Sequence, residues 1–442
     1  MALGEGITSS VPFPSAPDML LAMRPRLPKV DEDRGAFVAV TAGHTVIDVF
    51  NSMGPVLLAF LRTPMALSNA EIGLAVGTYQ FLAGATQPPF GWLADRIGSR
   101  WLGPISVGWS VSLVTFAFYL ANRTSDYKLF LLVFALAALG SGAFHPQGTM
   151  HAGRAAAGRS ETTTAVFFFG GQIGLTFGPA VTGILLARVG PPGIYGLAMA
   201  LTPVVLLMIW GLRHTSAKEH IERHRRAADE TRSQSISAGT LSLLVAVYTC
   251  RGWVIIGTAS LLPVLFQELG FGATGYGVLT GLFWLGGATT GVLAGGWARR
   301  FGRRRVVAFT TALGSVVLVF LPVSPGWLTF VLSIATGACL GAAHSILIVM
   351  AQSLLPLRQG LSSGLALGYF FGIGALASIA IGTLADYWSL VPVIQAGAVM
   401  GLAAAVLTLL LPASRTAASD DGPEAAMEAN LQPLTQHSTR EI

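Results

Sequence analysis

The chain has 442 residues, of which 52% are hydrophobic and only 11% are charged, against about 25% charged residues in a typical soluble domain. The net charge of +6 is small beside this apolar content. The composition therefore excludes a soluble enzyme, a disordered protein and a nucleic-acid binder, and it indicates an integral membrane protein in a lipid bilayer.

The chain begins with a polar, proline-rich segment without the short apolar core and small-residue cleavage site of a signal peptide. We expect residues 1–34 to be a cytoplasmic tail. Long apolar stretches follow, and a helix needs about 20 apolar residues to cross the hydrocarbon core. Backbone groups in lipid must satisfy one another, so each stretch is expected to be a helix. The sequence predicts twelve spans, at residues 35–61, 69–94, 101–121, 127–152, 162–188, 191–212, 239–267, 273–298, 305–323, 326–354, 360–386 and 391–411.

These spans divide into an N-terminal half, residues 35–212, and a C-terminal half, residues 239–412. The segment between them, residues 213–238, carries six Lys and Arg residues. It can be a solvated cytoplasmic linker or a short helix that binds the lipid surface. Residues 413–442 are acidic and polar, and we expect a disordered cytoplasmic tail.

The distribution of positive charge gives the expected orientation. Of the 27 Lys and Arg residues, 22 lie in the tails and in loops on one predicted side, and four lie on the other. Cytoplasmic loops carry an excess of Lys and Arg. Both termini and the central linker are therefore predicted to be cytoplasmic, in a multi-pass protein.

The two halves repeat one another at a shift of about 200 residues, which indicates an internal duplication. Three short motifs recur in the same order: Gly91-Trp92 and Gly296-Trp297, then Gly142-Ala143-Phe144-His145 and Gly341-Ala342-Ala343-His344, then Phe168-Phe169-Gly170 and Phe370-Phe371-Gly372. Two parallel six-helix repeats are the layout of a secondary transporter with its site between the halves.

The loop after the second span resembles the G-x-L-A-D-R-x-G-x-R signature of the major facilitator superfamily. The residues that carry this resemblance, and those of the matching loop, are Gly91, Asp95, Arg96, Gly98, Arg100, Arg300 and Arg304. The resemblance implies the major facilitator fold, an all-α membrane protein of twelve helices in two pseudo-symmetric halves. Asp95 can pair with the neighbouring arginines across helix ends and so form a cytoplasmic gate. The alternative is a charge cluster that only keeps this loop on the cytoplasmic side.

Within that superfamily, the first half is similar to the fosmidomycin resistance family of bacterial efflux proteins. The matching residues are His44, Asp48, Thr78-Tyr79-Gln80, Gln87-Pro88, Phe144-His145-Pro146, Gly170-Gly171 and Gly174 to Pro179. The resemblance implies the cytoplasmic (inner) membrane of a bacterium. Gly174, Gly178 and Pro179 also resemble an antiporter motif; a hinge in the fifth span and plain tight packing both remain open. Gln147 and Met150 stand where that family has an acid and a base, which weakens any transfer of roles from the fourth span.

Ionisable residues inside a membrane are costly and mark functional sites. They occur in the first, fourth, seventh and tenth spans, as His44, Asp48, His145, Arg251 and His344. His44 and Asp48 are four residues apart and share one helix face. We expect Asp48 to carry the coupling proton and His44 to modulate it; a structural ion pair is the alternative.

Arg251 is expected either to pair with Asp48 across the halves or to bind a substrate anion. His145 and His344 are expected either to line the cavity or to be buried histidines that are hydrogen-bonded within the core. Uncharged polar residues with the same two possible roles, cavity lining or helix packing, are Tyr79, Gln80, Gln87 and Gln172. No metal-ligand spacing occurs, so neither a metal site nor a cofactor other than protons is expected. A nucleophile–base pair and a phosphate loop are also missing from the sequence, so an enzyme is not expected.

The functional prediction is a proton-coupled exporter of small drug-like molecules, working as a monomer by alternating access. Two alternatives remain. If Asp48 pairs with Arg251, protonation of Asp48 frees Arg251 for an anion, and this linkage favours proton-coupled import of a small organic or phosphorylated anion. A membrane sensor that binds a ligand without moving it is the third possibility, although the central linker is short for an output domain.

Overall fold

A computed structural model describes residues 30–97, 99–154, 160–213, 237–355 and 359–412. The predicted tails lie almost wholly outside these residues, as does most of the linker. Every regular element among the described residues is helical. The N-terminal elements are α2 (Val30–Leu61), α3 (Asn69–Ala85), α4 (Gln87–Ile97), α5 (Ser99–Thr124), α6 (Tyr127–Arg154), α7 (Ser160–Arg188) and α8 (Pro191–Gly211). The C-terminal elements are α10 (Ala238–Gly252), η1 (Trp253–Gly257), α11 (Thr258–Glu268), α12 (Ala273–Phe301), α13 (Arg303–Phe320), η2 (Leu321–Val323), α14 (Trp327–Gly341), α15 (His344–Leu354), α16 (Gln359–Trp388) and α17 (Leu390–Leu410).

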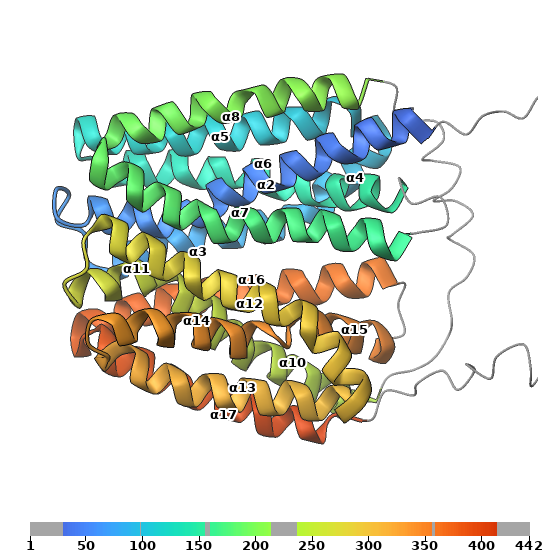
Figure 1. Cartoon of the computed structure of the whole chain (residues 1–442), viewed down its shortest axis with the longest axis vertical. Helices are drawn as coiled ribbons and strands as arrows, with labels where there is room; N and C mark the ends of the chain where they lie inside the picture. The colour runs from blue at the N-terminus through green and yellow to red at the C-terminus, as the bar shows by residue number, and fades with distance from the viewer. Residues whose placement is uncertain (1–29, 98, 155–159, 214–236, 356–358, 413–442) are drawn as a thin grey trace, which may run out of the picture.

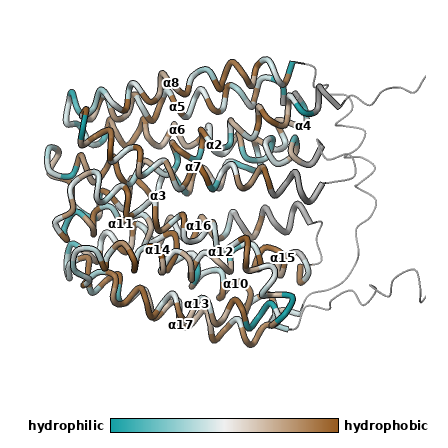
Figure 2. The backbone as a smooth tube through the Cα atoms, viewed as in Figure 1, coloured by the Kyte–Doolittle hydropathy of each residue, from teal (hydrophilic) through white to brown (hydrophobic). Residues whose placement is uncertain are grey.

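These elements form twelve membrane spans in two six-helix halves, as the sequence predicts. Figure 1 shows α2 to α8 in one bundle and α10 to α17 in the other, with α3 and α7 facing α16 and α12. In Figure 2, hydrophobic residues run along the length of the helices and hydrophilic residues gather at the helix ends. Large apolar side chains on the outer surface are exposed, among them Met199, Val292 and Leu410. This surface suits lipid rather than water.

The second span is not the continuous helix that the sequence predicts over residues 69–94. It consists of α3 and α4, which meet at Thr86. The Thr86 hydroxyl donates to the carbonyl of Leu82 at 2.6 Å. Pro88 and Pro89 follow, and because proline has no N–H they cannot extend the hydrogen bonding of α3, although they fit the first turn of a new helix. Eleven other helical segments among the described residues are long and apolar enough to cross a membrane alone.

Two C-terminal spans are also interrupted. The seventh span changes from α10 to a π-helical segment, η1, directly after Arg251 and Gly252, and then continues as α11. The tenth span is broken between α14 and α15, at Ala342 and Ala343. Single π-helical turns within α-helices occur often at functional sites. The sequence predicts both spans as continuous, because their apolar character does not change at the breaks.

Glycines bring the two halves into close backbone contact at the face opposite the predicted cytoplasmic side. A methyl group added at Gly73 of α3 would overlap the carbonyl of Ser378 in α16, and one added at Gly77 would lie 2.6 Å from the carbonyl of Ala375. Gly183 of α7 meets α12 in the same way. Such small residues allow membrane helices to pack at short distance.

Polar contacts join the halves at the same face. Arg62, at the end of α2, pairs with Glu268 of α11 at 2.8 Å. Asp386 of α16 accepts hydrogen bonds from the backbone N–H groups of Asn69 and Ala70, at 2.8 and 2.9 Å, and so satisfies the first turn of α3. Glycine packing and polar contacts thus hold the two halves together on one side of the membrane.

Candidate functional site

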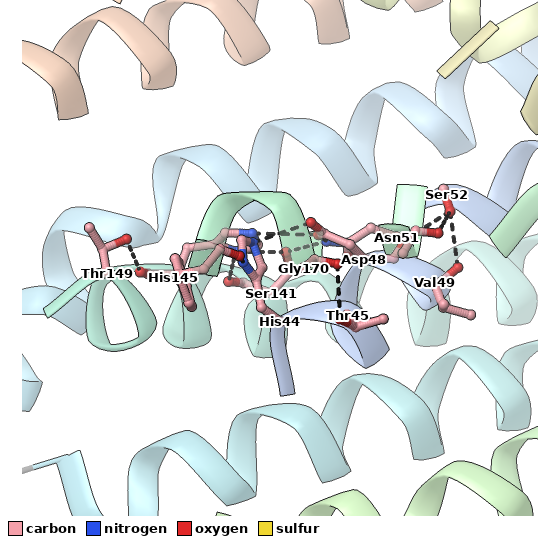
Figure 3. A network of polar contacts seen from close by, with 12 residues as sticks. His44, Thr45, Asp48, Val49, Asn51, Ser52, Ser141, His145, Thr149 and Gly170 are labelled. Carbon is pink, nitrogen blue, oxygen red and sulfur yellow. Dashed lines mark hydrogen bonds and ion pairs between the residues drawn. The ribbon is translucent and has the colours of Figure 1, made fainter. Parts of the chain in front are cut away.

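Three ionisable side chains meet inside the N-terminal half. Nε2 of His44 lies 3.3 Å from Oδ2 of Asp48, both on α2. Nε2 of His145, on α6, lies 3.6 Å from Oδ1 of the same carboxylate. His44 and Asp48 are 3% and 6% exposed, and His145 is half-buried. Figure 3 shows both imidazoles directed at Asp48; we call these three residues the His–Asp–His cluster.

Backbone carbonyls fix how each imidazole is turned. Nδ1 of His44 lies 2.8 Å from the carbonyl oxygen of Phe167, and Nδ1 of His145 lies 2.8 Å from that of Ser141. A carbonyl only accepts hydrogen bonds, so both Nδ1 atoms are the donors and carry hydrogen. The two Nε2 atoms that face Asp48 are therefore the atoms that gain or lose protons.

This geometry lets the cluster hold a variable number of protons. A contact between Nε2 and a carboxylate oxygen is attractive only when a proton lies between them, because both atoms otherwise present lone pairs. The net charge of the cluster is −1 without such a proton, 0 with one and +1 with two. Each of the two contacts of Asp48 is thus a position that one shared proton can occupy.

A polar chain orients the carboxylate. The side-chain amide of Asn51 donates to Oδ1 of Asp48 at 2.9 Å and to the hydroxyl of Ser141 at 3.1 Å. Tyr79 donates to the Asn51 carbonyl oxygen at 2.7 Å. Sequence reasoning selected Tyr79 but missed Asn51 and Ser141. Asn51 lies one helical turn after Asp48, a spacing that could have signalled it.

Helix α7 closes one side of the cluster. The ring of Phe167 stacks on His44 with centroids 4.1 Å apart. A methyl group added at Gly171 would lie 2.6 Å from Nε2 of His44 and 2.7 Å from Oδ2 of Asp48. Gly174 and Gly178 contact the backbone of α2. The motif of the fifth span therefore packs α7 against the helix that carries His44 and Asp48, and its role as a hinge stays a prediction.

Arg251 lies apart from the cluster. It is 1% exposed, and one Nη atom donates to the hydroxyl of Thr311 while the other donates to the carbonyl of Leu340 at 2.7 Å. Its Nε atom has no hydrogen-bond partner among the described residues. The predicted alternative of a pair with Asp48 is not formed in this structure. Substrate binding by Arg251 stays a prediction.

The other predicted cavity residues are dispersed. His344 begins α15 and lies beside Phe370, with ring centroids 5.3 Å apart. Gln80 donates to the hydroxyl of Ser260 at 3.2 Å and so links α3 to α11 across the halves. Gln87 and Gln172 are half-buried. Of the predicted cavity residues, His145 contacts Asp48 directly, and Tyr79 reaches it through Asn51.

The predicted cytoplasmic gate is described in part. Gly98 lies outside the described residues, and so does the side chain of Asp95, so the latch between acid and bases stays a prediction. Arg96 and Arg100 lie over the rings of neighbouring tryptophans at 3.9 and 5.3 Å, and Arg300 lies 5.2 Å from the ring of Phe301. Arg304 donates to the carbonyl of Leu411 at the end of α17. Gly91 comes near Pro146 of α6.

The two six-helix halves and the buried cluster define a multi-pass membrane protein with the architecture of a secondary transporter. The chain belongs to the Major Facilitator Superfamily, whose family model matches residues 40–272 and 241–441. This is a family of transporters of small molecules, and the chain is not an enzyme.

Known proteins similar to the chain agree with this assignment. The fosmidomycin resistance protein of Escherichia coli is 26% identical over 385 residues, which cover 86% of this chain and 93% of that protein. A gallate transporter of Pseudomonas putida is 26% identical over 72% of this chain and 77% of its own length. The crystal structure of a D-xylose-proton symporter has the same fold, with a TM-score of 0.66 at 16% identity over 86% of this chain and 98% of that one.

Proposed function

We propose that the chain is a proton-coupled antiporter that exports small drug-like molecules across a bacterial inner membrane. One observation carries the proposal: the Asp48 carboxylate faces two histidine Nε2 atoms, at 3.3 and 3.6 Å, inside one half of the protein. A buried acid between two bases can exchange protons without a partner from the other half. Asp48 is the proposed proton carrier, and the histidines adjust its protonation.

The location of Arg251 favours antiport over symport. If Asp48 paired with Arg251, a proton on Asp48 would free the guanidinium for an anion, and proton and anion would bind together. Here Arg251 is bonded to Thr311 and Leu340 instead. A neutral or cationic substrate that donates hydrogen bonds to Asp48 would then compete with the protons of the cluster, and competition between proton and substrate is the condition for antiport.

The similarity to a fosmidomycin resistance protein supports export of small drug-like molecules, with fosmidomycin as the first to test. In the proposed cycle, the described state is closed on the outer face by Arg62 with Glu268 and by Asp386 with the start of α3. The proposed opening is then on the cytoplasmic side, where Asp95, Arg96 and Arg100 would form the gate. The proposed working unit is a monomer with both termini in the cytoplasm.

A second candidate is proton-coupled import of a small organic anion. The observation that favours it is Arg251, a buried cation whose Nε has no hydrogen-bond partner among the described residues. The similarity to a gallate transporter supports an anionic substrate. A cluster with a net charge of +1 would also attract an anion together with its protons.

Proteoliposomes that enclose a pH-sensitive dye test the proposal. Fosmidomycin, gallate and a panel of cationic drugs would be added to wild-type protein, to Asp48→Asn and to Asp126→Asn. Asp126 is a matched control, because it is an exposed acid at the start of α6 that bonds only to nearby backbone N–H groups. We expect proton movement opposite to the substrate in the wild type and the control, and none in Asp48→Asn.

Three other outcomes of this assay would contradict the proposal. Proton movement in the same direction as the substrate would replace antiport by anion symport. Proton movement that persists in Asp48→Asn would remove Asp48 as the carrier. Substrate binding without movement of substrate or protons would indicate a membrane sensor instead of a transporter.

A further inference from the structure

The three side chains of the His–Asp–His cluster have the chemistry of metal ligands. His Nε2 and carboxylate oxygen are the donors that Zn²⁺ and similar divalent ions take, at about 2.0–2.2 Å. One ligand atom from each of His44, Asp48 and His145 lies within 4.8 Å of the other two. In a tetrahedral site with such bond lengths, neighbouring ligand atoms are about 3.3–3.4 Å apart. The two histidine Nε2 atoms lie 3.3 and 3.6 Å from the two oxygens of the Asp48 carboxylate, close to these separations. A modest approach of the two imidazoles, whose ligand atoms lie within 4.8 Å of each other, would enclose an ion.

The surroundings hold these ligands in the orientation that a metal requires. A metal-bound histidine usually donates its second ring N–H to a backbone carbonyl or a carboxylate, which fixes the ring and its tautomer. Both histidines do this, through the carbonyls of Phe167 and Ser141 at 2.8 Å. The ligating carboxylate is held as well, by the amide of Asn51 at 2.9 Å. The three ligands and the hydrogen-bonding groups that orient them are therefore both present.

The charge of the site also suits a divalent ion. A divalent ion bound to two neutral imidazoles and one carboxylate gives a net charge of +1. The same cluster with a proton in each of its two contacts also has a net charge of +1. A metal ion can thus replace two protons without placing additional charge in the buried site, which limits the cost of burial.

Access to the site comes from one side. Phe167 and Gly171 of α7 cover His44, whereas the His145 side chain is 25% exposed. Three protein ligands leave a fourth tetrahedral position for water on the side of His145. Structural zinc sites are usually closed by four protein ligands, whereas this cluster leaves one position open.

We infer that His44, Asp48 and His145 form a binding site for a divalent transition-metal ion of the Zn²⁺ or Co²⁺ type. The ion occupies the space between the two imidazoles and the carboxylate, and it excludes protons from that space. The inference stands on the geometry of the cluster and does not require the proposed function, because metal binding is measured on protein that is not transporting.

Co²⁺ is the probe, because its visible absorption reports tetrahedral coordination by nitrogen and oxygen. The protein would be purified through a tag without histidine. Four further histidines lie outside the described residues, and they would be removed from the starting protein by His214→Gln, His220→Gln, His224→Gln and His437→Gln so that they do not contribute to the titration. Titration of this protein with Co²⁺ is expected to give one saturable site with a tetrahedral spectrum, and Zn²⁺ is expected to displace the Co²⁺.

Single variants test the ligands. His145→Gln and His44→Gln are each expected to weaken Co²⁺ binding at least tenfold, and Asp48→Asn to do the same. His344→Gln is the matched control, since His344 is the repeat counterpart of His145 and lies beside Phe370 rather than beside a carboxylate. It is expected to leave binding unchanged. His145→Cys preserves a ligand and is expected to retain binding with a new thiolate-to-metal absorption band.

Absence of a saturable site in a folded starting protein would overturn the inference. Binding that survives unchanged in His145→Gln and Asp48→Asn would also overturn it. Thermal unfolding of each variant shows whether it is folded, and the His145→Cys spectrum identifies the site even where one glutamine variant fails to fold. Proton transport without metal binding would refute this inference alone, and metal binding without proton transport would refute the proposed function alone.

Discussion

The corresponding spans of the two halves hold their charges in different ways. In the N-terminal half, Asp48 lies between two histidines, in the arrangement on which the proposed proton exchange depends. In the C-terminal half, Arg251 has no carboxylate partner within the described part of the chain and is bonded to a hydroxyl and a backbone carbonyl. The N-terminal half thus surrounds an acid with two bases, whereas the C-terminal half surrounds a cation with neutral hydrogen-bond acceptors.

The break in the tenth span explains how the second half tolerates a buried cation. The Leu340 carbonyl that accepts from Arg251 belongs to the last turn of α14, which ends at Gly341. The last carbonyls of a helix have no partner within it, and they form the negative end of the helix dipole. Arg251 supplies both the hydrogen-bond donor and the positive charge that this helix end lacks. Arg251 thus caps a helix in this structure, whereas proton exchange remains the proposed role of Asp48.

The largest effect on stability is expected from Arg251→Met. It leaves the Leu340 carbonyl buried and without its donor, which costs about 1–3 kcal/mol, and it removes a cation from a helix C-terminus, which adds up to about 2 kcal/mol. We expect a clear fall in the free energy of unfolding, measured by chemical denaturation in detergent, while proton coupling persists in the folded fraction.

Arg304→Met is the matched control, because Arg304 also caps a helix, α17, but lies closer to solvent. Its loss is expected to cost about 1 kcal/mol or less. If Arg251→Met instead kept full stability and lost substrate movement, Arg251 would be a substrate-binding residue, and the contrast between the halves would disappear.

A smaller effect is expected from Gly171→Ala. The added methyl would lie 2.6 Å from His44 and 2.7 Å from Asp48, so the pair must separate or α7 must move, at a cost of about 1–3 kcal/mol. Gly372→Ala is the control, because Gly372 is the repeat counterpart of Gly170, next to Gly171, and a methyl group there meets no atom within 4 Å. We expect coupling and stability to fall in the first variant only, by dye assay and thermal unfolding. Equal behaviour of the two would show that the close approach of α7 is unimportant.

The smallest effect is expected from Glu268→Gln, which breaks a partly exposed ion pair with Arg62 between the halves. Such pairs contribute about 1 kcal/mol or less and are screened by salt. Arg62→Gln should have the same effect, and the double variant should have no more. A thermal-unfolding cycle at low and high salt measures this. A much larger coupling energy would mean that the halves are held together mainly by this pair rather than by their glycine contacts.

The sequence was sufficient for the architecture because lipid imposes simple rules. Length, hydropathy and the repeated motifs predict twelve helices in two halves, as observed. The break at Ala342 was missed because the residues around it are apolar and hydropathy does not change there. The break at Thr86 was missed because Gln87 and the two prolines were included in one long span. Only the proline pair at residues 88–89 signalled the first break, and the sequence offered no comparable signal for the π-helical turn after Arg251.

The sequence also predicted part of the candidate site. Helical spacing correctly placed His44 beside Asp48. It could not bring His145 to the same carboxylate, because that contact depends on how α6 packs against α2. For the same reason, the three possible metal ligands do not form a motif in the sequence. Whether Asp48 would meet Arg251 was equally open, since the rotation of each helix about its axis decides it.

The break at Thr86 has a consequence for topology. A count of the helical segments that are long enough to cross the membrane alone gives eleven spans among the described residues, because α3 and α4 are separately too short to be included. An odd number of crossings would put the two ends of the chain on opposite sides of the membrane. Counting the broken helix restores an even number, in agreement with Figure 1, where α2 begins and α17 ends at the same end of the bundle. A reporter fused to the C-terminus is therefore expected on the same side of the membrane as one fused to the N-terminus, whereas a count that omits the broken span would place them on opposite sides.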